Sequence, residues 1–221
     1  MILSDDTLEL LKSFSTINQS LLFKSGNVLA TVSPSKTIVA KATVNDTFPV
    51  EFAVYNLPEF LNDIGNFDHS PELTFEDNRV VMTDGEFSSS YPFDNAELII
   101  SPPKTDLELP SVDAEFKLSK SALLKVLRGA SILARPEVAF ICDGENISFS
   151  AIDVRNDMPK NFEHKVGQNT KNFKFVFRLE NMQLMPRDYD VTISHSGHIA
   201  HFKSDIVEYY VVVESTSTYD E

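Results

Sequence analysis

The chain has 221 residues, of which 42% are hydrophobic, and its 33 acidic and 19 basic residues give a net charge of −14. This length suits one large β domain or two domains of about 110 residues each, and the negative charge ordinarily argues against nucleic-acid binding. The single cysteine, Cys142, excludes an intrachain disulfide, and no apolar run is long enough to span a membrane.

The first predicted element is an amphipathic helix over residues 5–16, with Ser4 as its N-cap. Strands follow, then a short helix over 57–64, in which Pro58 suits the first turn. The strands predicted in this half of the chain are 20–24, 27–32, 37–44, 48–55, 72–76, 79–84, 86–91 and 96–100.

The segment 101–113 is predicted to be a linker. It carries Pro102, Pro103 and Pro110 among charged residues, and prolines cannot supply the hydrogen bonds of a central strand. We therefore expect a domain boundary here, between an N-terminal domain, 1–110, and a C-terminal domain, 111–221.

The second half follows the same plan. Ser119 caps a predicted helix over 119–129 that ends at Gly129, and another short helix is predicted over 179–184, before Pro186. The strands predicted here are 137–142, 145–152, 161–167, 173–178, 189–195, 198–203 and 206–213, and the polar tail from residue 215 is expected to fray.

The two halves also correspond residue by residue at their first helices. At an offset of 115 residues, Leu3, Ser4, Leu8 and Leu11 recur as Leu118, Ser119, Leu123 and Val126. A chain with two similar halves usually contains two similar domains. The expected fold class is α+β, with two such domains.

One window of the sequence is basic, although the chain is acidic. Residues 1–110 hold 6 basic and 17 acidic residues, whereas 116–136 holds five basic residues and no acid. Lys117, Lys120, Lys125 and Arg128 fall within about 140° on a helical wheel. Such a stripe suits contact with phosphates, although a solvated helix face is the plainer interpretation.

Residues that could support catalysis or bind metal give weaker signals. A two-residue turn at Ser196-Gly197 would place His195 and His198 on one face of a hairpin, with His201 on the other, so a third zinc ligand is missing. The paired carboxylates sit at turns and helix starts, where capping explains them. We therefore expect no enzymatic activity, no metal and no cofactor.

Three stretches carry a family resemblance. They are the opening, with Leu11-Lys12-Ser13-Phe14-Ser15-Thr16-Ile17-Asn18 and Leu22-Phe23-Lys24-Ser25-Gly26, the stretch Asn181-Met182-Gln183-Leu184-Met185-Pro186-Arg187-Asp188-Tyr189, and the run Tyr210-Val211-Val212-Val213-Glu214. In them the chain resembles the DNA polymerase sliding clamps, or processivity factors, of T-even-type bacteriophages.

This resemblance implies a closed ring of three identical subunits, each with two clamp domains. Two helices of each domain would line the central hole, and antiparallel sheets would form the outside. The lining helices would be 5–16, 57–64, 119–129 and 179–184, and the candidate DNA-binding residues are Lys12, Lys117, Lys120, Lys125, Arg128 and Arg135. Because Asp5, Glu9, Glu59 and Asp63 lie on the first two helices, the contact with DNA is expected to be dominated by the second domain.

The resemblance also implies partners. The protein would encircle duplex DNA without reading its sequence, would tether the replicative DNA polymerase, and would be opened by an ATP-dependent clamp loader. Candidate residues for a pocket that binds partner peptides are Leu107, Leu109, Pro110, Val212 and Val213. Asp5 and Asp6 stand where a secretion signal would need apolar residues. We therefore expect a soluble protein in the cytoplasm of the infected bacterial host.

Two other classes of protein stay open. A β-rich structural virion protein that assembles through its sheets would explain the many strands, but it has no need of an acid-free basic helix. An enzyme with His195 and His198 at its site is the third possibility. The oligomeric state separates the sliding clamp from the virion protein, because a ring predicts a defined trimer and a virion protein predicts large assemblies.

Overall fold

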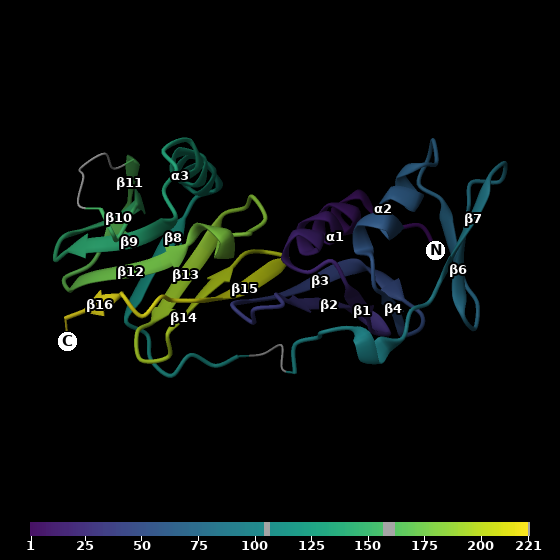
Figure 1. The fold of residues 1–221 in the computed structure, drawn as a ribbon, viewed down its shortest axis with the longest axis horizontal. Coiled ribbons are helices and arrows are strands. Elements are labelled where there is room, and N and C mark those ends of the chain that lie inside the picture. The colour runs from purple at the N-terminus through teal and green to yellow at the C-terminus, as the bar shows by residue number, and fades with distance from the viewer. Residues whose placement is uncertain (104–106, 157–161, 221) are drawn as a thin grey trace. The chain divides into compact units, whose positions relative to one another are not determined.

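The computed structural model describes residues 1–103, 107–156 and 162–220. The chain forms two compact units, Met1–Thr105 and Asp106–Glu221, drawn with their helices and strands in Figure 1. Each unit has its own hydrophobic core.

The first unit places two helices among three small groups of antiparallel strands. β1 pairs with β4, β2 pairs with β3, and β6 lies between β5 and β7. A single bridge joins Ile2 to Glu72. In chain order the elements are α1 (Asp5–Ile17), β1 (Leu21–Phe23), β2 (Gly26–Val32), β3 (Ile38–Phe48), β4 (Phe52–Val54), α2 (Leu57–Gly65), β5 (Glu72–Phe75), β6 (Arg79–Thr83), β7 (Ser88–Pro92) and the 3₁₀ turn η1 (Ala96–Leu98).

The second unit contains one α-helix and two groups of antiparallel strands. One group has the order β11-β10-β9-β12-β16, and in the other β13 pairs with β8 and β14, which pairs with β15. The elements are β8 (Ala114–Leu118), α3 (Lys120–Ile132), β9 (Glu137–Asp143), β10 (Asn146–Ile152), β11 (Phe162–Gln168), β12 (Asn172–Arg178), the 3₁₀ turn η2 (Leu179–Asn181), β13 (Tyr189–Ser194), β14 (Ile199–Lys203), β15 (Val207–Val212) and β16 (Thr218–Tyr219).

The two units share most of their order of elements. An extended segment leads into a helix, four strands follow, then a helical segment, then three strands. The α+β fold with antiparallel sheets is confirmed. The 115-residue offset in the sequence therefore reflects a repeated structural plan, in which Ser4 and Ser119 stand at the same point.

The first helix begins at Ser4 for a local reason. Its side-chain oxygen accepts a hydrogen bond from the Thr7 N–H at 3.3 Å, while Leu10, Leu11 and Phe14 on the inner face are fully buried. Asp46, on β3, accepts hydrogen bonds from the Ser4 N–H at 2.9 Å and from the Ser4 hydroxyl at 2.7 Å. The helix N-terminus is thus held both by its own cap and by a carboxylate from a strand.

Replacing Asp46 with Asn should destabilise the protein near neutral pH by about 1 kcal/mol, because a partly exposed charge that supports a helix N-cap is lost. Burial raises the pKa of Asp46. Hydrogen bonds from Thr7 and Ser4 together lower it by more than burial raises it, so the pKa lies below its ordinary value of 3.8. A carboxylate whose folded pKa is lowered stabilises the fold above its unfolded pKa, and this stabilisation is lost as the pH falls through the folded pKa.

The measurement is urea unfolding of wild type and Asp46→Asn at pH 7 and at pH 3, at one protein concentration. The difference in unfolding free energy should shrink at the lower pH. The exposed Asp68 provides the control, because Asp68→Asn should change stability at neither pH. An Asp46→Asn deficit that stays the same at pH 3 would contradict the assigned role of the charge.

Two helix predictions for the second unit were wrong in detail. The helix α3 does not end at Gly129 but continues to Ile132. Gly129 is buried, and a Cβ there would lie 2.6 Å from the Phe162 ring, so the glycine allows a close approach and does not end the helix. The left-handed residue after the helix is Ala134, with φ of 50°.

The expected helix 179–184 is only the three-residue turn η2. Arg178 gives it no side-chain cap, and Pro186 follows too soon for a second turn to form. The second unit therefore contributes one α-helix, not two, among the residues that the structure describes.

Three strand assignments also differ. The predicted strand 96–100 is the turn η1, because Asn95 accepts a hydrogen bond from the Glu97 N–H at 3.0 Å and starts a helical turn. β8 was missed, although Ala114 and Leu118 alternate with exposed residues. The tail, expected to fray, contains β16.

Candidate nucleic-acid interface

The helix α3 divides into an apolar and a basic face. Ala122, Leu123 and Val126 are buried against the unit, where α3 packs on β9, β10 and β11. Lys120, Lys125 and Arg128 are exposed, and in the part of the chain that the structure describes none of them forms an ion pair. Leu124 interrupts this face and is 44% exposed.

A carboxylate from a distant loop holds the start of α3. Ser119 accepts a hydrogen bond from the Ala122 N–H at 3.2 Å, and Asp188 accepts one from the Lys120 N–H at 2.6 Å. The first turn of α3 has no acidic residue of its own, so Asp188 supplies the negative charge that a helix N-terminus favours. Asp188 was not among the predicted site residues, although a first helical turn with a lysine and no acid signals the need for such a partner.

Two of the predicted DNA-binding residues lie away from this face. Lys117 belongs to β8, so its place on the helical wheel was wrong, and its Nζ lies 3.1 Å from Asp190 Oδ1. The side chain of Arg135 is 11% exposed, and its guanidinium lies 3.9 Å from Asp153. Three of the six predicted cations, those on α3, therefore share one exposed surface.

The helices of the first unit present mostly acids. On α1 the exposed residues are Asp5, Asp6, Glu9, Lys12 and Thr16, so Lys12 is an isolated cation among three carboxylates. The helix α2 exposes Glu59 and has no Lys or Arg in its sequence. Among the described helices, the exposed Lys and Arg residues therefore concentrate on α3.

The residues predicted to form a peptide pocket differ in their exposure. Leu107 and Leu109 are half-buried, while Pro110 is exposed and lies so close to Gly197 that a Cβ there would meet its ring at 2.8 Å. Val212 is half-buried on β15 opposite Ile199. Val213 is 2% exposed, so it belongs to the core.

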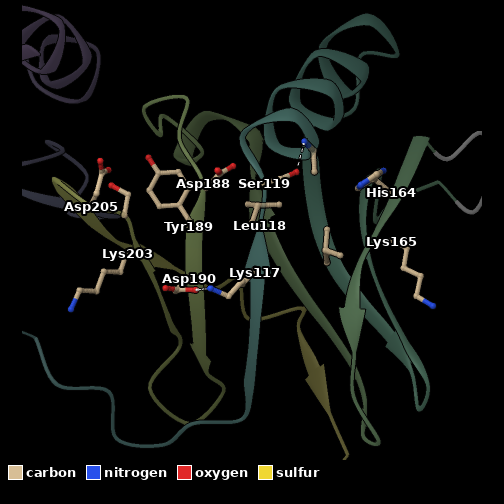
Figure 2. Close-up of a pocket in the computed structure, with 13 residues that line it drawn as sticks. Lys117, Leu118, Ser119, His164, Lys165, Asp188, Tyr189, Asp190, Lys203 and Asp205 are labelled. Atoms are coloured by element: carbon tan, nitrogen blue, oxygen red, sulfur yellow. Dashed lines mark hydrogen bonds and ion pairs between the residues drawn. The ribbon is translucent and has the colours of Figure 1, made fainter.

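A cavity of about 670 Å³ lies elsewhere in the second unit, between β11 and the strands β8, β13 and β14 (Figure 2). Lys117 and Asp190 line it and pair with each other at its exposed edge, and Asp190 lies opposite Lys203 on β14. His164 and Lys165 line it from β11, and the carboxylates of Asp188 and Asp205 line it from the other side. Charges of both signs are interspersed, so the cavity favours neither an anion nor a cation.

The histidines do not converge. The last paired residues of the β13–β14 hairpin are Ser194 and Ile199, so the turn has four residues and not the two expected. The rings of His195 and His198 lie 6.0 Å apart, and His201 Nε2 lies 2.8 Å from Glu208. Within the described residues no group of three or more His, Cys, Asp or Glu could hold a metal ion. None of the described helices has the length and apolarity to cross a membrane.

The fold is that of a DNA clamp. The chain is 12% identical to the clamp PCNA of A. fulgidus, solved with the C-terminal region of FEN-1 bound, and the two superpose with a TM-score of 0.70 over 96% of each chain. A likeness at this identity shows the fold.

Sequence comparison then identifies the family. The model for the DNA polymerase processivity factor matches residues 4–75, and that for the gp45 sliding clamp, C terminal, matches 115–215. The sliding clamp of Vibrio phage KVP40 is 32% identical over 97% of this chain and its own full length, and that of Enterobacteria phage T4 is 28% identical over the full length of both. The chain belongs to the phage sliding-clamp family and is a processivity factor of DNA replication.

Proposed function

We propose that this protein encircles duplex DNA as a homotrimeric ring and tethers the replicative DNA polymerase to it, without catalysis of its own. The observation that carries the proposal is the surface of α3, where Lys120, Lys125 and Arg128 are exposed in a chain of net charge −14. A few cations suffice if the ring retains DNA by topology, and tight binding would hinder sliding. The acidic remainder of the surface repels DNA from the wrong side.

Ring assembly requires two different surfaces on each subunit, each able to bind the neighbouring subunit, and unpaired strand edges can serve as such surfaces. Among the described residues, β7 in the first unit and β11 in the second each pair with a strand on one side only. β11 is seven residues long and mostly exposed. An unprotected edge of this length ordinarily invites pairing with another chain. We propose that β7 of one subunit joins β11 of the next, and that the chain divides into clamp domains 1–110 and 111–221.

The remaining partners follow from family membership. We propose a clamp loader that uses ATP to open the ring, a polymerase segment that docks on the clamp, and action in the cytoplasm of the infected bacterial host. The docking of the C-terminal region of FEN-1 on the A. fulgidus clamp supports a peptide site of some kind in this chain as well. No observation favours the alternative of a structural virion protein.

DNA synthesis on a long primed template tests this function. With the cognate polymerase and loader in limiting amounts, adding this chain should lengthen the products of a single binding event, because a tethered polymerase does not dissociate between nucleotides. Unchanged product lengths would contradict the proposal. Sedimentation of the same preparation at micromolar concentration should give the mass of three chains, and a monomer would contradict the ring.

A further inference from the structure

The segment after β15 adds a strand to the edge of β12. Phe173 and Lys174 pair with Tyr219 and Thr218. Around this short ladder, the Glu214 N–H donates to Val176 O at 2.9 Å, the Val176 N–H donates to the Ser217 hydroxyl oxygen at 2.9 Å, and the Asp220 N–H donates to Asn172 O at 3.0 Å. The segment is therefore held as a peptide is held in β-augmentation, by main-chain hydrogen bonds at a sheet edge.

An aromatic side chain anchors this segment. The Tyr219 ring stacks on Phe175 with a centroid distance of 6.1 Å and an interplanar angle of 19°, and it lies 5.9 Å from the His195 ring. Phe175 is fully buried. In the part of the chain that the structure describes, His195 Nδ1 is buried without a hydrogen-bond partner. The edge thus has a place for one aromatic ring beside a polar atom that a ligand could satisfy.

Charge at this edge favours an acidic occupant. The stretch from Lys171 to Arg178 carries three cations and no acid. The segment from residue 214 carries three acids and no cation, and Glu214 Oε1 lies 3.2 Å from Arg178 Nε. Complementary charge of this kind steers association and selects partners.

The contacts that hold the segment are few. β16 is two residues long, and both Thr218 and Tyr219 remain at least partly exposed. Segments with few buried contacts open locally at far lower free energy than the whole domain. A groove of about 1390 Å³ lies beside the start of the segment. Its lining includes Glu214, Ser215 and Thr216 of the segment, Lys174, Val176 and Arg178 of β12, and the acidic residues Glu137, Asp153 and Glu180. A partner peptide that replaced the segment could therefore gain contacts that the segment does not make.

We propose that the β12 edge is a docking site for an extended acidic peptide with one aromatic side chain, supplied by the polymerase, and that residues 214–220 occupy this site in cis until the partner displaces them. The proposal rests on the proposed function for the identity of the partner. The strand addition and the exchange of the segment do not depend on it.

The first experiment measures exchange alone. A fluorescent peptide of residues 214–221 is titrated by anisotropy into the full chain and into a chain that ends at Val213. The peptide should bind the shortened chain about tenfold more tightly than the full chain, because only the shortened chain has a vacant edge, and it should bind less tightly as salt rises. Equal binding to both chains, or binding to neither, would overturn the proposal.

Point variants keep the test meaningful if the shortened chain fails to fold. In the full chain, Tyr219→Ala should raise the affinity of the clamp for the wild-type peptide, while Tyr219→Phe, which keeps the ring, should not.

Changes in the peptide test the same anchor. A peptide with Ala in place of Tyr219 should bind the clamp about tenfold more weakly than the wild-type peptide does, since it lacks the ring that packs on Phe175. Lys174→Glu in the clamp should weaken binding of the acidic peptide. Variants without these effects would contradict the assigned anchor and charge.

The second experiment tests the partner. Excess peptide should shorten the products of the polymerase on primed DNA only when the clamp is present, and the peptide with Ala at the tyrosine position should not. Peptide binding without this competition would overturn the polymerase as the occupant. If wild-type clamp itself gives no processivity, the proposed function fails, whereas the anisotropy result stands on its own.

Discussion

A single cut in a circular DNA should release the protein that has been loaded onto it. The chain carries a charge of −14 and gathers three exposed cations on one helix per subunit, which is too few for a tight, sequence-independent grip at physiological salt. Retention must then come from topology. A ring on a closed circle has no exit, whereas a ring on a linear duplex slides off the ends.

The measurement is the fraction of protein that stays with DNA during gel filtration, before and after a nuclease cuts the circle at one site. We expect high retention on the circle and near-complete loss after cutting. Two controls separate sliding from damage by the nuclease. A circle without the site should keep the protein, and a linear duplex with bulky proteins bound at both ends should keep it as well. Equal retention on cut and uncut DNA would refute encirclement.

Removing the basic face of α3 should weaken loading onto DNA, whereas a closed ring that is already on a circle should stay there. In the variant Lys120→Ala, Lys125→Ala and Arg128→Ala, each subunit loses up to three phosphate contacts. The slope of log affinity for DNA against log salt should then fall by up to about 2.7 per subunit, and the amount of clamp loaded should drop by about tenfold at 150 mM salt. These side chains are exposed and lie opposite the packed face, so trimer formation and thermal stability should stay unchanged.

A matched variant makes this test specific. Lys24→Ala, Lys36→Ala and Lys203→Ala remove the same charge from exposed positions outside α3. If loading depends on the α3 surface, the control variant should load as wild type does across salt concentrations. If both variants load equally poorly, only net charge matters. If both load normally, the basic face of α3 is only a solvated face.

The stability of the α3 surface depends on a contact that local sequence does not reveal. Asp188 holds the Lys120 N–H at 2.6 Å, although 68 residues separate them. In the first unit Asp46, which lies on β3, accepts a hydrogen bond from the Ser4 N–H. Capping by Ser4 and Ser119 could be predicted, because it needs only the next three residues. The carboxylate that reinforces each cap comes from a strand or loop whose position is set by the fold.

The same division applies to the helix ends. Gly129 predicts a helix end by local rules, yet the Phe162 ring lies where a Cβ would be, so the glycine serves packing between α3 and β11. Lys117 shows the converse error. Its spacing from Lys120 and Arg128 suits a helix, but pairing with β13 makes it a strand residue. Periodicity alone cannot choose between two structures when a partner strand supplies the deciding hydrogen bonds.

The sequence by itself determined the repeat, the α+β class, the first helices of both units and the basic stripe, because these depend on side-chain period, capping and charge along short stretches of chain. Only the tertiary structure decided that three of the six predicted cations share one surface, that Val213 is core, and that the polar tail forms a strand on β12. Those outcomes depend on contacts between residues tens of positions apart, and no local pattern encodes which distant partner a polar or aromatic side chain will find.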